Sequence, residues 1–257
     1  MLQALDEVGI EPDLVLGTSI GAFNGAVVAE ETGTNGAERL TELWDEITRA
    51  DLFKGGFIDR VRNVATLKPA VEDNKDLRRL LEEIHGAEMK IEDLAIPFQC
   101  VAACIERSSE HWFRSGPLVD SILASSAVPA LFPPVEIGGE HFYDGGLVNS
   151  IPVDRAVELG ATRVFVLQVG RIEAPLRPPT RLYEAALISF EIARRHRFST
   201  QYENLPDEIE VHLLPSGNTV EFDDRRQLKW RDTGLTSELI EGAFEATQQY
   251  LGDQGIT

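Results

Sequence analysis

A pentapeptide near the start of the chain has the residue types and spacing of a nucleophilic serine site. Gly17-Thr18-Ser19-Ile20-Gly21 is a G-x-S-x-G motif that lies between a short apolar run and a segment rich in small residues. In a nucleophile elbow the serine lies on a sharp strand-to-helix turn, where strained backbone and close packing favour flanking glycines. The helix start also favours negative charge. We therefore predict Ser19 as a nucleophile, Gly17 and Gly21 as parts of its elbow, and the Ile20 N–H as an oxyanion donor.

A serine needs a neighbouring base to become a good nucleophile. The histidines that could serve are His85, His111, His141, His196 and His212. No local pattern marks any of them, and each is interpreted as a surface or edge residue. The order serine, acid, histidine of a catalytic triad remains open, because His196 and His212 follow several acids.

Asp144 is a second candidate base. It ends an apolar-alternating segment and is followed by Gly145 and Gly146, so its carboxylate would be presented on a tight turn. Taken alone, this pattern is more typical of a β-turn aspartate that caps its own backbone.

Together, the two motifs resemble those of the patatin-like phospholipase family, which combines a G-x-S-x-G elbow with a D-G-[AG] turn. The segments from Ala124 to Pro129 and from Phe132 to Val135 resemble the part of the family that precedes this turn. Asn149 and Pro152 match residues that follow it. The resemblance extends to about Val169, and beyond that point only the layout is similar.

The resemblance implies a single patatin-like domain over residues 1–257, with a three-layer α/β/α fold and a central, mostly parallel sheet. It implies a serine acyl hydrolase of the phospholipase A or lysophospholipase type, acting on lipid esters. Ser19 would form an acyl-enzyme, and Asp144, presented by Gly145 and Gly146, would be its base. Because a free aspartate has a pKa of about 3.9, we expect burial to raise the pKa of Asp144. The scheme requires no metal and no cofactor, and no spacing of acids suggests a calcium loop.

The start of the chain departs from the family pattern. The family carries a strand and a G-G-G-x-[KR]-G oxyanion loop before the helix that ends here at Gly9, whereas this sequence begins at Met1 within that helix. Gly55-Gly56 and Gly138-Gly139 occur in the wrong order to replace the loop. Three explanations stay open: a native start upstream of Met1, a short homologue with impaired catalysis that binds lipid or a partner, or a partner chain that supplies the missing elements.

Apolar periodicity predicts the elements that must position these residues. Helices are expected at residues 2–8, 19–30, 36–50, 72–85, 120–128 and 181–198. Strands are expected at residues 13–17, 96–105, 164–169 and 209–214. Alternation of this kind predicts an α/β fold with a mostly parallel sheet.

The charge balance excludes some classes of partner. The 257 residues carry 24 Lys+Arg against 43 Asp+Glu, a formal charge of −19. A nucleic-acid binder would need a basic surface, and an anionic membrane should repel the protein as a whole. The excess of arginine over lysine leaves two interpretations open, a high-GC genome or adaptation to high salt.

Two cysteines and the lack of long apolar runs bear on the compartment. Cys100 and Cys104 are expected on one face of a strand as buried free thiols. No run of 18 apolar residues and no secretory signal pattern occurs, so the cytoplasm is the default expectation. An N-terminal signal stays open if the native chain starts upstream of Met1.

The stretch from Arg171 to Arg197 departs from the global charge, with six arginines and three glutamates. One interpretation is a helix that ends in basic residues, which complement its dipole. The other is a lid or docking helix that holds a phosphate-bearing head group and gives peripheral membrane contact. The sequence indicates no oligomeric state.

Overall fold

The computed structural model describes residues 1–31, 33, 36–49, 74–129, 132–168, 175–179, 182–217 and 233–256. Gly55-Gly56 lies outside these residues, as do residues 171–174, 180 and 181 of the basic stretch.

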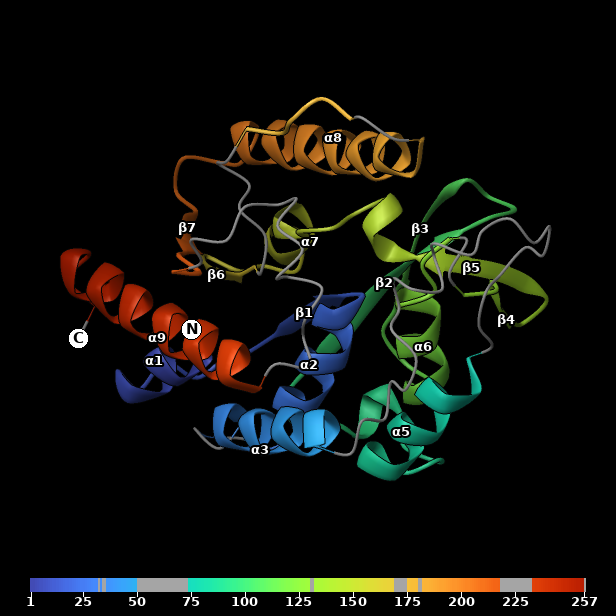
Figure 1. The fold of residues 1–257 in the computed structure, drawn as a ribbon, viewed down its shortest axis with the longest axis horizontal. Helices are drawn as coiled ribbons and strands as arrows, with labels where there is room; N and C mark the ends of the chain where they lie inside the picture. Colours follow the sequence, from blue (N-terminus) through green and yellow to red (C-terminus); the bar gives the residue numbers. More distant parts are fainter. Residues whose placement is uncertain are drawn as a thin grey trace.

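The described helices cover both sides of the strands in a layered arrangement (Figure 1). The α-helices are α1 (Leu2–Glu7), α2 (Ile20–Ala29), α3 (Gly36–Arg49), α5 (Lys75–His85), α6 (Leu118–Ser125), α7 (Val153–Glu158), α8 (Leu182–Glu203) and α9 (Thr233–Asp253). Two short 3₁₀ turns are η1 (Ile91–Asp93) and η2 (Gly145–Leu147).

The described strands form two sheets. They are β1 (Val15–Thr18), β2 (Phe98–Cys104), β3 (Ser109–Phe113), β4 (Val135–Ile137), β5 (Glu140–Asp144), β6 (Arg163–Leu167) and β7 (Glu210–Leu214). The first sheet has the order β1-β2-β5-β4, with β3 also paired to β2, and the second sheet is β6-β7. β1 and β2 pair in parallel, as do β6 and β7, whereas the pairs β2–β3, β2–β5 and β4–β5 are antiparallel.

The α/β fold class predicted from the sequence is confirmed. Helices and strands alternate along the chain. In each of the two parallel pairs, helices lie between the two strands along the chain. The expected strand at 96–105 and the expected helix at 19–30 appear with bounds shifted by one or two residues. The apolar-alternating segment predicted to end at Asp144 forms β5. Strand β4 was not among the predicted elements, because its three residues are too few to show a period.

Strand β2 is the element that brings the two candidate catalytic motifs together. Thr18, the last residue of β1, pairs with Val101 of β2, and Asp144, the last residue of β5, pairs with Ala102. Strand β3 pairs with Cys100–Cys104 along the other edge of β2, so β1 and β5 share one edge. Their carboxyl ends meet there, and the residue after Thr18 therefore lies next to Asp144.

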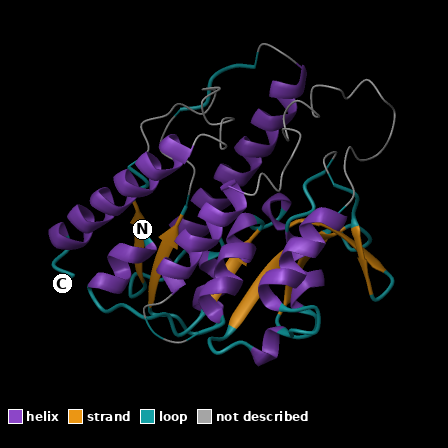
Figure 2. Ribbon diagram, turned by 60° about the horizontal axis from the view of Figure 1, so that its bottom comes forward, coloured by secondary structure: helices purple, strands orange, loops and turns teal. Residues whose placement is uncertain are grey.

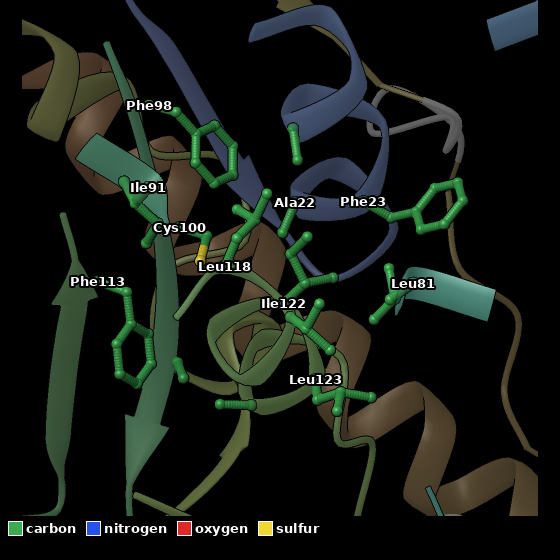
Figure 3. Close-up of a cluster of buried hydrophobic side chains, with 14 of the residues drawn as sticks. Ala22, Phe23, Leu81, Ile91, Phe98, Cys100, Phe113, Leu118, Ile122 and Leu123 are labelled. Atoms are coloured by element: carbon green, nitrogen blue, oxygen red, sulfur yellow. The ribbon is translucent and has the colours of Figure 1, made fainter. Parts of the chain in front are cut away.

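The main core lies between this sheet and helices α2, α5 and α6. Figure 3 shows side chains of α2 and α6 meeting those of β2 and β3. The residues labelled there are Ala22, Phe23, Leu81, Ile91, Phe98, Cys100, Phe113, Leu118, Ile122 and Leu123. Cys100 and Cys104 are buried free thiols, as predicted. The elbow and the D-G-G turn are thus attached to a densely packed part of the molecule.

The last third of the chain builds further layers. Helix α9 lies beside α1 and shares a small core with it, so the N- and C-terminal segments meet (Figures 1 and 2). Helix α8 crosses above α7 and near η2 (Figure 1). None of the described helices combines the length and the hydropathy that crossing a bilayer requires.

Candidate active site

The G-x-S-x-G motif forms a strand–turn–helix elbow. β1 ends at Thr18, α2 begins at Ile20, and Ser19 between them has φ 56° and ψ −122°, outside the usual regions for a side-chain-bearing residue. Gly17 is required by close packing, since a Cβ there would lie 2.5 Å from both the Ala22 Cα and the Gly21 carbonyl oxygen. A Cβ at Gly21 would meet no atom within 4 Å, so close packing requires glycine only at the first glycine position of the motif.

Ser19 and Asp144 are in direct contact. The Ser19 hydroxyl donates a hydrogen bond of 2.6 Å to Oδ2 of Asp144, and the Gly146 N–H donates one of 2.7 Å to Oδ1. Asp144 is 4% exposed. Gly145 allows the tight turn, since a Cβ there would collide with the Val101 carbonyl. Both carboxylate oxygens are therefore held, one by a hydroxyl and one by a backbone amide.

The electrostatic setting of Asp144 favours a stronger base than a free aspartate. Burial raises the pKa of Asp144 above its ordinary value of 3.8, against the opposing effect of the hydrogen bonds from Ser19 and Gly146. No ion pair to Asp144 is present in the described part of the chain. Because neutral partners stabilise a carboxylate less than a cation does, burial dominates.

The start of α2 presents backbone N–H groups close to the nucleophile. The first helical hydrogen bonds run from the N–H groups of Ala22 and Phe23 to the Ser19 carbonyl, at 2.8 and 3.2 Å. The N–H groups of Ile20 and Gly21 precede these bonds, at the end of a helix that favours negative charge. They are candidate donors to an oxyanion formed at Ser19.

The C-terminal end of α6 and the residues that follow it contact both members of the pair, and sequence reasoning missed this role. The Ser19 N–H donates to Oγ of Ser125 at 3.0 Å, and the Asp144 N–H donates to the Ala127 carbonyl at 2.9 Å. This segment belonged to the resemblance, but no property of its residues marked either contact.

The five histidines lie away from Ser19, each bonded elsewhere or at the surface. His111 contacts Arg107 on an exposed hairpin, His141 pairs with Glu106, and His196 is exposed on α8. The interpretation as surface or edge residues is wrong for His85 and His212, which are both buried. His85 lies 2.5 Å from a Glu30 oxygen. His212 lies 3.1 Å from the Tyr250 hydroxyl.

The predicted match at Asn149 lies at the centre of a polar network. The Thr18 hydroxyl donates to the Asn149 carbonyl at 2.9 Å. The Asn149 side-chain amide donates to Glu110 at 3.2 Å and to Asp154 at 3.1 Å, and Arg197 of α8 donates to the same Glu110 at 3.0 Å. α8 is thereby linked to the loop that supports the elbow.

The interpretation of a helix ending in basic residues is wrong. α8 continues to Glu203, and its last turn contains no basic residue. Arg194 and Arg195 lie within the helix and both donate to Glu191, at distances between 2.6 and 2.8 Å. These arginines therefore form ion pairs with a carboxylate of the same helix, and they do not lie at the helix end, where they would complement its dipole.

A shallow groove of about 740 Å³ lies between α7 and α8 and includes Asp154, His196, Arg197 and Gln201. Neither Ser19 nor Asp144 lines this groove. The described residues hold no cluster of three or more His, Cys, Asp or Glu side chains suited to a metal.

Comparison with known proteins agrees with the motifs. The family model described as patatin-like phospholipase matches residues 1–157. The chain is 30% identical over 172 residues to patatin-like phospholipase domain-containing protein 6 of Mus musculus, covering 66% of this chain and 12% of the relative. It is 32% identical over 180 residues to lysophospholipase NTE1 of Mycosarcoma maydis, covering 67% of this chain and 9% of that protein. The chain thus spans only about a tenth of the length of these relatives, and with its elbow, its turn and the matched residues it belongs to the patatin-like phospholipase family.

Proposed function

We propose that the chain is a serine acyl hydrolase that cleaves carboxylic esters of lipids through a dyad of Ser19 and Asp144. The hydrogen bond of 2.6 Å from the Ser19 hydroxyl to Oδ2 of the buried Asp144 carries the proposal. Family membership supports lipid ester hydrolysis as the general activity, and one relative is named a lysophospholipase. A phospholipase A or lysophospholipase reaction is the specific form we propose.

In the first half-reaction, Ser19 Oγ attacks the ester carbonyl carbon while its proton passes to Asp144. The tetrahedral intermediate then collapses, the proton moves from Asp144 to the departing alkoxide, and an acyl-enzyme remains on Ser19. In the second half-reaction, Asp144 takes a proton from water as the water oxygen attacks the acyl carbon. The fatty acid leaves, and the proton returns to Ser19.

The negative oxygen of both intermediates needs donors. The Ile20 N–H, with that of Gly21 beside it, is available at the start of α2. Removal of one oxyanion donor typically costs about 10²–10³ in rate, so the number of donors present matters for how active the chain is.

Exposed apolar side chains next to the dyad fit a lipid substrate. Ile20 directly follows the nucleophile and is 44% exposed, and Leu147, which ends the turn that presents the base, is 43% exposed. Large apolar groups that stay accessible beside a reactive centre can bury an acyl chain, at about 25 cal/mol for each Å² removed from water.

The proposal is tested by turnover of a short-chain nitrophenyl ester and a lysophospholipid. Wild type, Ser19→Ala, Asp144→Asn, His196→Ala and His212→Ala are compared, with a fluorophosphonate probe to report labelling of Ser19. We expect the first two variants to lose turnover and the histidine variants to keep it.

Other results would contradict the dyad or support one of the alternative functions. Turnover retained in Asp144→Asn would remove the dyad, and loss in a histidine variant would favour the triad. A wild-type chain that binds lipid vesicles without hydrolysis or labelling would instead be the impaired homologue.

A further inference from the structure

We propose that Ser125 is a positioning residue for the dyad, setting the backbone of the nucleophile from the C-terminal end of α6. The inference rests on the proposed function of Ser19 and Asp144. It is carried by the two hydrogen bonds that join Ser19 and Asp144 to one short segment, Ser125 to Ala127.

The bond on the nucleophile side holds a strained residue. Ser19 has φ 56°, a left-handed conformation that costs about 1–3 kcal/mol for a residue with a side chain. Its N–H donates to Ser125 Oγ at 3.0 Å, from 106 residues away in the chain. Such a conformation persists when surrounding contacts determine it, and this hydrogen bond is a side-chain contact that acts directly on the Ser19 backbone.

The bond on the base side comes from the same segment. The Ala127 carbonyl accepts from the Asp144 N–H at 2.9 Å, two residues beyond Ser125. The segment is itself tied to α6, because the Ser126 N–H donates to the carbonyls of Ile122 and Leu123 at 3.0 and 3.2 Å. One structural unit therefore fixes the main chain of both reacting residues.

The end of α6 and the residues up to Ala127 are held rigidly enough to fix the positions of Ser19 and Asp144. Leu118, Ile122 and Leu123 of α6 extend into the main core (Figure 3), and Ser125 itself is 0% exposed. Close-packed interiors shift little, so the distance between the two anchor points stays nearly constant. Ser125 thereby helps to hold Ser19 Oγ at 2.6 Å from Asp144.

Removing the Ser125 hydroxyl should act on the chemical step. The Ser19 N–H would lose its acceptor, and the elbow could relax away from its strained angles. Misplacement of a reacting group by about 1 Å can cost about 100-fold in rate. We expect kcat to fall at least about tenfold in Ser125→Ala, with KM nearly unchanged because Ser125 is fully buried.

Ser121 provides a matched control on the same helix. It is 2% exposed, and its hydroxyl donates to the Pro117 carbonyl at 2.8 Å, one turn before Ser125. Ser121→Ala thus removes a buried hydroxyl from α6 without removing a hydrogen bond to the dyad. Ser125→Cys is a second variant, which keeps the site filled, with a somewhat larger atom, but offers a much weaker acceptor.

The experiment measures ester turnover and, independently, amide hydrogen exchange of the Ser19 N–H by NMR, relative to the amides of β2. We expect Ser125→Ala and Ser125→Cys to lower kcat and to accelerate Ser19 exchange selectively. Ser121→Ala should change neither. Wild-type kcat and wild-type Ser19 protection in Ser125→Ala would overturn the proposal, as would full activity in Ser125→Cys, which would make volume the important property.

The two arms separate this proposal from the function on which it rests. If the wild-type chain hydrolyses no ester, the proposed function fails, and the exchange of Ser19 alone decides whether Ser125 holds the elbow. If the wild type is active but the Ser125 variants match it in both measurements, the positioning role fails and the dyad stands.

Discussion

Two buried carboxylates in this molecule have opposite electrostatic surroundings. Asp144 is 4% exposed and accepts hydrogen bonds from a hydroxyl and a backbone amide, and burial raises its pKa. Glu191 of α8 is 7% exposed. Burial alone would raise its pKa, but hydrogen bonds and charges from Arg194 and Arg195 outweigh that effect and lower it.

Burial does not by itself make a carboxylate reactive. A buried carboxylate with cationic partners is a stable anion and a weak base, suited to holding a helix. A buried carboxylate with only neutral donors keeps its affinity for a proton, as a general base requires. The partners therefore decide which of the two serves chemistry.

The largest expected effect comes from replacing each carboxyl by its amide. Asp144→Asn should lower turnover by about 10³-fold or more, since the proton acceptor is lost, while thermal stability at neutral pH stays equal or rises. Glu191→Gln should instead keep turnover within a few-fold of wild type and lower the Tm. Ester turnover and thermal melts of both variants check this, and a loss of turnover in both to the same degree would contradict the distinction.

Removing the cations beside Glu191 should have the next largest effect. Arg194→Ala combined with Arg195→Ala leaves a buried carboxylate without its two ion-pair partners. We expect a loss of about 2 kcal/mol, close to thirtyfold in the unfolding equilibrium, because these side chains are partly exposed and full burial would cost more.

Urea unfolding at neutral pH measures the loss. Adding Glu191→Gln to the double variant serves as the control and should recover part of the stability, because the unpaired charge is gone. No recovery would mean that the arginines act through packing alone.

The contributions of Asp144 and Glu191 to stability should depend on pH in opposite directions. Because the folded pKa of Asp144 lies above 3.8, turnover should fall about tenfold for each pH unit below that folded value. For stability, the Asp144 contribution is present below pH 3.8 and is lost as pH rises through its folded pKa. The folded pKa of Glu191 lies below 4.5, so its contribution is present above 4.5 and is lost as pH falls through the folded value.

Unfolding free energies of wild type, Asp144→Asn and Glu191→Gln from pH 3 to pH 7 check these signs. The gain of Asp144→Asn over wild type should appear only as pH rises. An acid limb of turnover centred at or below pH 3.8 would contradict the raised pKa of Asp144.

The smallest expected effect concerns the strain at Ser19. Glycine adopts positive φ without penalty, so Ser19→Gly should be more stable than Ser19→Ala by about 1 kcal/mol, or about fivefold in the unfolding equilibrium. Both variants lack the nucleophile and should be inactive. Equal melting temperatures for the two would show that the elbow carries no measurable strain.

The local parts of the site were predictable from the sequence. The elbow around Ser19 and the turn at Asp144 are each specified by a few neighbouring residues, since glycine is needed where backbone approaches closely, as at Gly17 and Gly145. The structure describes Ser19 and Asp144 in direct contact, although the roles assigned to them remain proposals.

The long-range parts were not predictable. The contact of Ser19 with Ser125 joins residues far apart in the chain, and a serine near the end of an apolar helix has no distinctive pattern. The interactions of Arg194 and Arg195 depend on where α8 ends, and a sequence marks helix ends poorly without glycine or proline. Strand β4 was missed because three residues give little periodicity.

The buried thiol of Cys100 gives the molecule an internal reporter. Cys100 is fully buried, burial raises the pKa of its thiol, and it pairs in register with Gly17 of the elbow strand. A thiol reagent in water can therefore modify it only after the core that packs around it has opened. The rate of modification would measure how often the core beneath Ser19 opens, in native protein and without a substrate.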